Sequence, residues 1–137
     1  MQPPGAPSVL FLSGFRDESE MYEEYLRLVG LRVRVVTDEQ AALDAALREP
    51  PDLIVVRVRY STLAADGIGV ISRLKASALT RHAPAIVLTT SGAAAEQAAA
   101  VRAGCDSVLL LPTFPEDLAA EIQRLLDERQ TLRAPSV

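Results

Sequence analysis

Five short apolar runs, separated each time by a segment with helical periodicity, constrain the fold of this chain more than any other feature. The runs are residues 8–13, 31–37, 53–58, 85–90 and 107–111. Near-continuous apolar strands are typical of a parallel sheet covered on both faces, because the connecting helices pack on those faces. Since crossovers between parallel strands are right-handed as a rule, the alternation predicts an α/β fold. Its five-stranded parallel sheet is doubly wound, with helices on both faces.

The segments between the runs carry the end signals of helices. The first helix is expected to begin at Asp17 and to end at Gly30. Asp38 is expected to cap the second, Ser91 an alanine-rich fourth helix, and Pro115 opens the last. In the first helix the apolar residues at helical spacing are Met21, Tyr25, Leu28 and Val29. Such spacing is typical of an inward face, and Met21, Tyr22 and Tyr25 are expected to lie partly in the core.

Length and composition fit one globular domain. The chain has 137 residues, of which 49% are hydrophobic and 23% charged. We expect a disordered lead over residues 1–7, a single domain over 8–130 and a tail over 131–137. No apolar run approaches the roughly 20 residues of a membrane span. Because the start also lacks the pattern of a signal peptide, a cytoplasmic location is expected.

Charge and rare residues exclude several classes of function. A net charge of -4 argues against direct binding of nucleic acid, whose backbone attracts basic surfaces. Cys105 is the only cysteine, so it forms no internal disulfide, and we expect a small buried residue there. His82, the only histidine, is expected on a solvated loop. Neither a zinc site nor a Ser-His-Asp triad is supported, and no metal or cofactor is expected.

The stretch PDLIVVRVRY, residues 51–60, places an arginine near the exit of an otherwise apolar strand. The guanidinium of Arg57 stays charged and carries five N–H donors, so it needs partners there. Ligands of doubly wound sheets bind beyond the carboxyl ends of the strands. The residues expected at those ends are Ser13, Gly14, Arg57, Thr89 and Leu111.

The order and spacing of several stretches resemble a known family. These stretches are RDESEMYEEYLRLVG, EQAALDAAL, PDLIVV, the Asp66-Gly67 pair, PAIVLTT, AGCDSVLLLP and FPEDL. Together they are similar to the receiver domain of response regulators, from Ser8 to Arg129. The resemblance implies the strand order 2-1-3-4-5 and a role in bacterial two-component signalling. It also suggests a cis peptide bond between Leu111 and Pro112, as is common at this position in receivers.

Measured against this resemblance, the family's chemistry is expected to be absent. Receivers end their first strand with two acidic residues that hold magnesium, and Ser13 and Gly14 stand there instead. The phosphoacceptor aspartate corresponds to Arg57, and a lysine before the proline corresponds to Leu111. Only a hydroxyl, that of Thr89, remains. Because phosphoryl transfer to a carboxylate needs that carboxylate, a metal and cationic stabilisation, we expect a pseudo-receiver with no catalytic residue and no metal site.

Two roles for Arg57 fit this position. In the first it pairs with a nearby acid and braces the loops, and the acids considered are Asp17, Glu18 and Asp66. In the second it forms an anion pocket with Thr89 and loop amides, for a phosphate or a partner's carboxylate. Arg59 would share the face of Arg57 if the strand extended that far. Val108 stands where receivers often have an aromatic residue, which suggests one fixed conformation.

The expected function is that of a stand-alone atypical receiver, not an enzyme, that acts by phosphorylation-independent protein–protein interaction. A signalling protein, such as a kinase or an output regulator, would dock on the face of the fourth helix, fifth strand and fifth helix, which receivers commonly use. In this chain that face draws on residues near 93–103 and 114–129. A homodimer is an alternative, and neither nucleic acid nor a membrane is expected as a partner. Two other functions stay open: a phosphorelay receiver with an unorthodox acceptor, and a sensor of a small anionic ligand at the strand ends.

Overall fold

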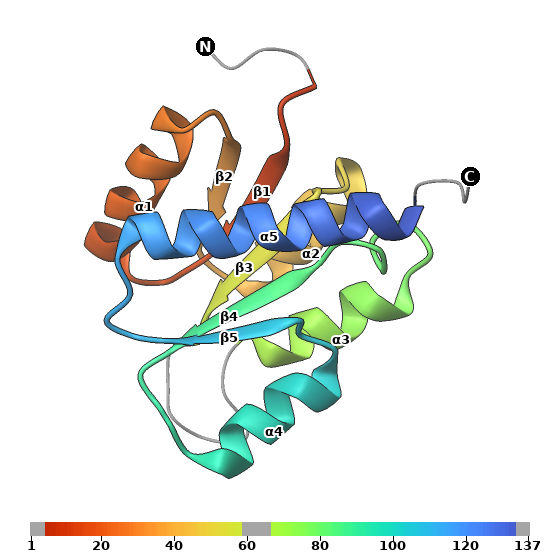
Figure 1. The fold of residues 1–137 in the computed structure, drawn as a ribbon. Coiled ribbons are helices and arrows are strands. Elements are labelled where there is room, and N and C mark those ends of the chain that lie inside the picture. Colours follow the sequence, from red (N-terminus) through yellow and green to blue (C-terminus); the bar gives the residue numbers. More distant parts are fainter. Residues whose placement is uncertain (1–4, 59–66, 134–137) are drawn as a thin grey trace.

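A five-stranded parallel sheet forms the centre of the computed structural model, which describes residues 5–58 and 67–133 (Figure 1). The strands lie in the order β2-β1-β3-β4-β5. Their bounds are β1 Ser8–Leu12, β2 Arg32–Val36, β3 Leu53–Arg57, β4 Ala85–Thr89 and β5 Ser107–Leu110. The predicted doubly wound α/β fold and its strand order are confirmed.

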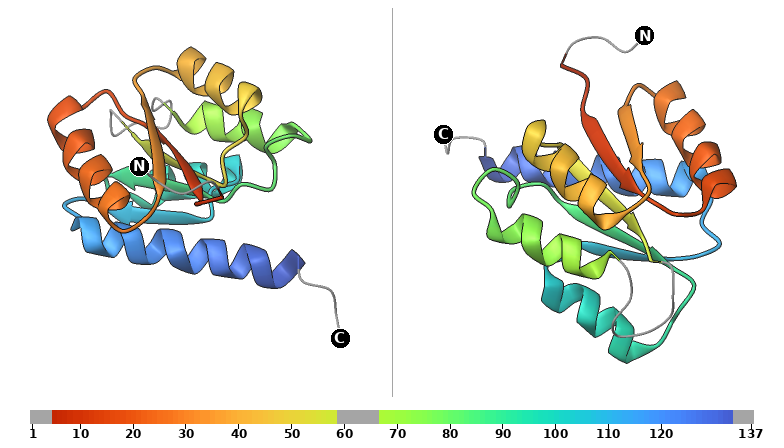
Figure 2. Two further views of the ribbon diagram at one scale, coloured as in Figure 1. Left: turned by 90° about the horizontal axis from the view of Figure 1, so that it is seen from above. Right: turned by 180° about the vertical axis from the view of Figure 1, so that it is seen from behind.

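Helices cover both faces of this sheet. Their bounds are α1 Arg16–Leu28, α2 Glu39–Arg48, α3 Ile68–Ala76, α4 Ala94–Ala103 and α5 Pro115–Arg133. Figure 2 shows α1 and α5 on one side and α2 and α3 on the other. Two separate clusters of buried side chains match this division, one beneath α1 and α5 and one beneath α2, α3 and α4. The chain therefore has three layers, with an apolar core on each side of the sheet.

Strand β3 lies in the middle of the sheet and is buried along its whole length. Leu53 and Val55 belong to the core beneath α1 and α5, whereas Ile54 and Val56 belong to the opposite core. Burial of one such side chain contributes about 1.5–3 kcal/mol to stability. This alternation explains why the strand has a continuous apolar sequence, and it directs the side chain of Arg57 to the α1 and α5 side.

Helix α1 buries Tyr22, as expected, but not most of the other apolar residues at helical spacing. Its buried residues are Ser19, Tyr22 and Leu26. Met21, Leu28 and Val29, predicted to face inward, are exposed. Both sets have helical spacing, so periodicity alone does not decide between them. The sheet selects the face with Tyr22, whose ring packs on Phe11 and whose hydroxyl donates to the Thr113 carbonyl at 2.5 Å.

Several local expectations are confirmed. Asp38 is the N-cap of α2, where its carboxylate accepts from the Ala41 amide at 2.8 Å. The Leu111-Pro112 bond is cis. Cys105 is buried, and burial raises the pKa of its thiol, so the reactive thiolate is disfavoured. His82 is exposed before β4.

The expected cap of the fourth helix is wrong. Ser91 lies ahead of the helix, and Ala93 occupies the N-cap position of α4. The Ser91 hydroxyl instead accepts from the Ala93 amide at 3.2 Å, which makes a local turn before the helix starts. Within the described parts of the chain, no helix has the length and apolar character needed to cross a membrane.

Candidate functional site

The carboxyl ends of the strands meet at one edge of the sheet, where the sequence analysis located the site. Leu12 pairs in register with Val56, and Arg57 with Leu88. The five predicted residues directly end or follow strands β1, β3, β4 and β5; they are Ser13, Gly14, Arg57, Thr89 and Leu111. The topology therefore brings them to one edge, and their side chains decide what that edge can do.

Arg57 is the one charged side chain of the described residues that belongs to the buried set. It is only 9% exposed. Its Nε donates to Oε1 of Glu18 at 2.7 Å, and its Nη1 donates to the carbonyl of Val58. The guanidinium carbon lies 4.2 Å from the centre of the Phe15 ring, which is cation–π geometry. Internal contacts therefore compensate this buried cation.

The turn between β1 and α1 supplies two of the groups that hold Arg57. Phe15 is the N-cap residue of α1, and Glu18 lies in the first turn of the same helix. A carboxylate in a first turn is favoured by the helix dipole. The hydroxyl of Ser13, a buried residue, accepts from the Phe15 amide at 3.0 Å and shapes the turn. Ser13 thus positions the aromatic ring that covers the guanidinium.

Tyr22 links this cluster to the segment after β5. Burial is the main reason why the pKa of its hydroxyl is raised, and the negative charge of Glu18 adds to the rise. The hydroxyl therefore remains protonated and donates to the Thr113 carbonyl. The segment that carries the cis bond, the start of α1 and the end of β3 are in this way connected through Tyr22, Glu18 and Arg57.

Thr89 and Leu111 are joined by a backbone hydrogen bond, but neither makes a described contact with Arg57. The amide of Leu111 donates to the carbonyl of Thr89 at 2.7 Å. The Thr89 side chain is buried, and its hydroxyl accepts from the Ser91 amide at 3.0 Å. The hydrogen bonds described for Arg57 go to Glu18 and Val58 instead.

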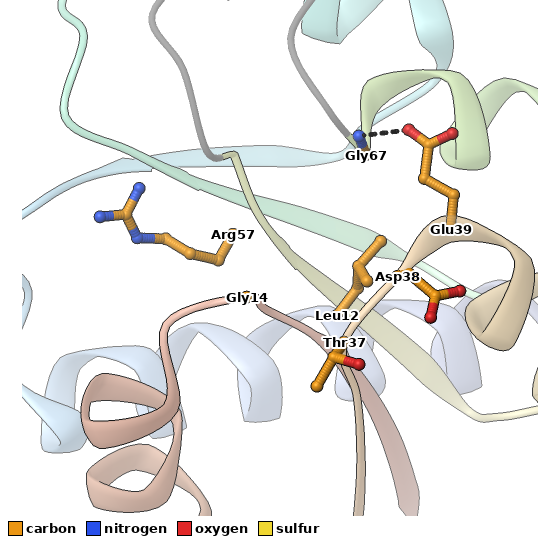
Figure 3. A pocket seen from close by; sticks show the side chains of 7 residues that line it. All are labelled: Leu12, Gly14, Thr37, Asp38, Glu39, Arg57 and Gly67. Atoms are coloured by element: carbon orange, nitrogen blue, oxygen red, sulfur yellow. Dashed lines mark hydrogen bonds between the residues drawn. The ribbon is translucent and has the colours of Figure 1, made fainter.

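A pocket of about 210 Å³ lies beside Arg57 at this edge (Figure 3). It is lined by Leu12, Gly14, Thr37, Asp38, Glu39, Arg57 and Gly67. Figure 3 shows the Arg57 guanidinium directed away from the carboxylates of Asp38 and Glu39. Glu39 Oε1 accepts from the Gly67 amide at 2.8 Å, while Asp38 caps α2. Both carboxylates therefore already hold backbone amides.

The site contains residues that the sequence analysis missed and lacks some that it named. Phe15, Glu39 and Gly67 were not predicted as site residues. For Phe15 the sequence offered one signal, an aromatic residue soon after the end of a strand. For Glu39 and Gly67 it offered none, because a carboxylate that binds a distant backbone amide leaves no sequence pattern. Asp17 is exposed and has no described contact with Arg57. The two remaining predicted residues, Asp66 and Arg59, lie outside the described part of the chain.

The described residues form no metal-ligand cluster at this edge. Among residues 5–58 and 67–133, no three side chains of the His, Cys, Asp and Glu types lie together in a way that could hold an ion. Among the described residues that line the pocket, only Asp38 and Glu39 carry carboxylates. With their oxygens engaged by amides, the described residues offer few free oxygen ligands to a hard cation.

The edge of the sheet at β5 differs from the Arg57 region, because it exposes large apolar side chains. Val101 on α4 is 61% exposed, Leu110 on β5 51% and Phe114, just before α5, 71%. We name these three residues the β5-edge patch. Beside it Glu121 of α5 accepts from the Ser107 hydroxyl and from Arg124, whose Nε lies 2.6 Å from Oε1. The Arg124 hydrogen bond is the main reason why the pKa of Glu121 is lowered.

Comparisons with known proteins agree on one family. The family model described as the response regulator receiver domain matches residues 10–123. No curated protein matches the chain. Among solved structures, one classed as a response regulator from Chloroflexus aurantiacus J-10-fl is 25% identical with a TM-score of 0.81, over 89% of this chain and 98% of that chain.

Two further structures have the same fold at lower identity. A receiver domain protein described as CheY-like, from Methanospirillum hungatei JF-1, is 17% identical with a TM-score of 0.83, over 93% of this chain and 99% of that chain. The signal receiver domain of a histidine kinase from Syntrophus aciditrophicus is 23% identical with a TM-score of 0.81, over 96% and 97% of the two chains.

Proposed function

We propose that this chain, which belongs to the response regulator receiver domain family, is an atypical receiver. In this proposal it signals without phosphorylation. Receiver domains act in two-component signalling, where they interact with signalling proteins such as kinases and output regulators. In this proposal the chain docks to such a protein through a fixed surface. The proposal includes no catalytic activity.

The observation that carries the proposal is the environment of Arg57. In the family pattern the third strand ends with the aspartate that accepts the phosphoryl group, and here β3 ends with Arg57. Its guanidinium pairs with Glu18 and stacks on Phe15. Glu18, a carboxylate close to this position, is therefore already engaged in an ion pair. The position of the phosphoacceptor itself holds a cation, which cannot accept a phosphoryl group.

The magnesium ion that the family implies does not fit the described residues. The first strand is followed by Ser13 and Gly14, where receivers have two acids. The Ser13 hydroxyl is engaged with the Phe15 amide, and Gly14 has no side chain. Because Mg²⁺ is held through carboxylates and water in near-octahedral geometry, one neutral hydroxyl is a poor substitute. We therefore assign no step to a metal.

The surface proposed for the partner is the face of α4, β5 and α5. It combines the exposed apolar β5-edge patch with an α4 rich in alanine, including exposed Ala94, Ala95 and Ala98. Large apolar side chains exposed on neighbouring elements are typical of protein–protein contacts. A second copy of the chain is the alternative occupant of this face.

Intact-protein mass spectrometry after incubation with acetyl phosphate and magnesium tests the first part of the proposal. We expect no added phosphoryl mass, and no rise in melting temperature with magnesium alone, because a ligand of the folded state would raise it. A phosphorylated chain would contradict the proposal, and mapping the adduct would identify the carboxylate. Two controls are available: a receiver with its aspartate, and the variant Ser13→Asp/Gly14→Asp/Arg57→Asp/Leu111→Lys, checked for folding by circular dichroism.

Site-specific photo-crosslinking tests the surface. A photoreactive residue at Leu110 should yield a defined adduct in cells that produce the chain, whereas one at Leu47, an exposed residue of α2, should not. The adduct should persist in Arg57→Ala, because Arg57 has a structural role in this proposal. Loss of the adduct in a folded Arg57→Ala chain would favour an anion pocket, and an adduct of the chain with itself would identify a homodimer.

A further inference from the structure

Another pocket lies at the opposite edge of the sheet from Arg57, where the strands begin. Its volume is about 210 Å³, and its lining includes Lys75, His82, Asp106, Leu125, Glu128 and Arg129. Pro84, also in the lining, directly precedes β4, and Asp106 directly precedes β5. Figures 1 and 2 show the end of α5 beside the segment between α3 and β4. The pocket therefore joins elements that are far apart in the sequence.

Helix α5 contributes an apolar surface and two opposite charges to this pocket. Leu125, Glu128 and Arg129 stand at positions i, i+3 and i+4, so they share one side of the helix. Leu125 is buried and belongs to the core beneath α1 and α5. Glu128 is exposed, and Arg129 is partly buried. A carboxylate and a guanidinium thus stand next to each other beside an apolar side chain.

Arg129 has more hydrogen-bond donors than the described residues use. Its Nη1 donates to the Asp52 carbonyl at 2.7 Å and lies 3.6 Å from Oδ1 of the same residue. A guanidinium carries five N–H donors. Among the described residues, none accepts a hydrogen bond from Nε or Nη2 of Arg129. These two nitrogens can hold a carboxylate through two parallel hydrogen bonds.

The carboxylates of the pocket each keep one oxygen for a ligand. Oε1 of Glu128 accepts from Nη1 of Arg124 at 2.7 Å. Oδ2 of Asp106 accepts from the Ala85 amide at 2.8 Å and from Nζ of Lys75 at 3.2 Å. The second oxygen of either carboxylate has no hydrogen-bond partner among the described residues. Both can therefore accept from an ammonium group, which carries three N–H donors.

We propose that this pocket binds a free α-amino acid with an apolar side chain. Arg129 holds the carboxylate of the ligand through its fork of N–H donors. Glu128 and Asp106 accept hydrogen bonds from the ammonium group of the ligand. Leu125 and Pro84 contact its apolar side chain. The ligand in this way uses the polar groups that the described residues leave available.

Charge and size favour this class of ligand. The lining carries two fixed cations, Lys75 and Arg129, and two carboxylates, Asp106 and Glu128. A ligand with charge of one sign meets like charges here, which disfavours it, whereas a zwitterion complements both signs. The volume lies below the roughly 300–1,000 Å³ of pockets for drug-sized ligands. An amino acid therefore suits the pocket, and a nucleotide is too large for it.

The position of the pocket makes this site independent of the function proposed above. It lies at the amino ends of β4 and β5, whereas Arg57 ends β3 at the opposite edge. The ligand connects the end of α5 with the starts of two strands. Its binding does not depend on phosphorylation, so failure of one proposal leaves the other standing.

A titration of the whole chain, followed through its amide NMR signals, tests the proposal. The probes are alanine, valine, leucine and phenylalanine, each added alone. For at least one of them we expect saturable shifts before β4, before β5 and in the last turns of α5. For that amino acid, two analogues are then compared: the acid without the amino group and the amine without the carboxyl group. Each should bind about tenfold more weakly or worse, because each loses hydrogen bonds between charged groups.

Substitutions locate the site. Glu128→Gln keeps the size of an exposed side chain but removes its charge, and should weaken binding about tenfold. Asp127→Asn is the matched control, since Asp127 is an exposed neighbour on α5 outside the lining, and it should bind as the native chain does. Arg129→Lys keeps the charge but loses the fork, so it should also weaken binding. Because Arg129 contacts Asp52 as well, the amide spectrum of this variant is checked for native folding.

Four results would overturn the proposal. The first is that none of the four amino acids gives saturable shifts, and the second is that the shifts map to another part of the chain. The third is that the acid or the amine binds as tightly as the amino acid, which would indicate a site for a simple ion. The fourth is that a folded Glu128→Gln chain keeps the native affinity.

Discussion

The carboxyl edge of the sheet around Arg57 and the edge at β5 differ in what satisfies their side chains. Around Arg57 the described polar side chains have partners within the chain: Arg57 donates to Glu18 and to the Val58 carbonyl, and Glu39 accepts from the Gly67 amide. At the β5 edge, Leu110 and Phe114 are directed to solvent without such partners. A closed edge contributes to stability, whereas an open one is available to another protein. The two regions should therefore respond to mutation in opposite ways.

The largest effect is expected at the closed edge for Gly67→Ala. Gly67 has a φ of +95°, and a Cβ there would lie 2.3 Å from Cγ1 of the buried Val56. A left-handed conformation costs about 1–2 kcal/mol for an L-residue, and overpacking of a core about 1–3 kcal/mol more. We expect a loss of roughly 2–5 kcal/mol in the free energy of unfolding, measured by urea denaturation.

Gly30→Ala is the matched control for that substitution. Gly30 has a similar φ of +102°, but a Cβ there meets nothing within 4 Å. Only the conformational cost of about 1–2 kcal/mol should remain. Equal losses for the two substitutions would mean that the packing of Gly67 on Val56 is loose, and the carboxyl edge would then not be closed.

A smaller and asymmetric effect is expected at the ion pair of Glu18 and Arg57. Breaking a buried pair by removal of one partner costs about 3–5 kcal/mol. The side chain of Glu18 is 29% exposed and that of Arg57 8%. Glu18→Ala strands a buried guanidinium and should cost about 2–3 kcal/mol after allowance for solvent. Arg57→Met leaves a carboxylate that water reaches, and should cost about 1 kcal/mol or less.

Denaturation of both single variants and of the double variant measures this pair. The double variant should be close in stability to Arg57→Met alone, because the stranded charge is then absent. If Arg57→Met destabilises more than Glu18→Ala, the role of Arg57 lies mainly in its contacts with Phe15 and the Val58 carbonyl. The closed edge would then depend on stacking more than on charge.

Arg57 also illustrates how far the sequence predicts this site. An arginine at a strand exit indicates that a partner acid exists, and three acids were named for it. The structure pairs it with Glu18; neighbouring residues on a helix point about 100° apart, so Glu18 and Asp17 cannot both face the strand end. That direction depends on how α1 docks. The Phe15 stack depends on the same docking, and no pattern in the sequence indicates it.

The fold was more predictable than the docking of its helices. Apolar runs and helical segments predicted each strand and helix, because short-range patterns decide their type. The strand order came from the resemblance to receivers, since periodicity does not contain it. The buried face of α1 was predicted only in part: Tyr22 was expected partly in the core and is buried, whereas Met21 and Leu28 have the same helical spacing and are exposed. Periodicity does not show which side of this helix meets the sheet.

Glu121 provides a pH-dependent test at the open edge. Its pKa is lowered from an ordinary value of 4.5, chiefly by the hydrogen bond from Arg124. A carboxyl with a lowered pKa in the folded state stabilises the chain above its unfolded pKa, and this contribution is lost as pH falls through the folded value. Glu121→Gln should therefore be less stable than the native chain at neutral pH, with a difference that shrinks as pH falls below about 4.5. Urea denaturation at several pH values measures it, and a constant difference would show that the network of Ser107, Glu121 and Arg124 does not hold in solution.

The smallest effect on stability is expected for Phe114→Ala, and it is the sharpest test of the open edge. Phe114 is 71% exposed, so its truncation removes little buried area, and the free energy of unfolding should change by no more than about 0.5 kcal/mol. Binding should respond in the opposite sense, because large aromatic side chains dominate the affinity of protein interfaces. A photo-crosslink from position 110 should therefore weaken in Phe114→Ala while urea denaturation stays unchanged. A substantial loss of stability would instead mean that Phe114 packs on its own domain in solution, and the contrast between the two edges would disappear.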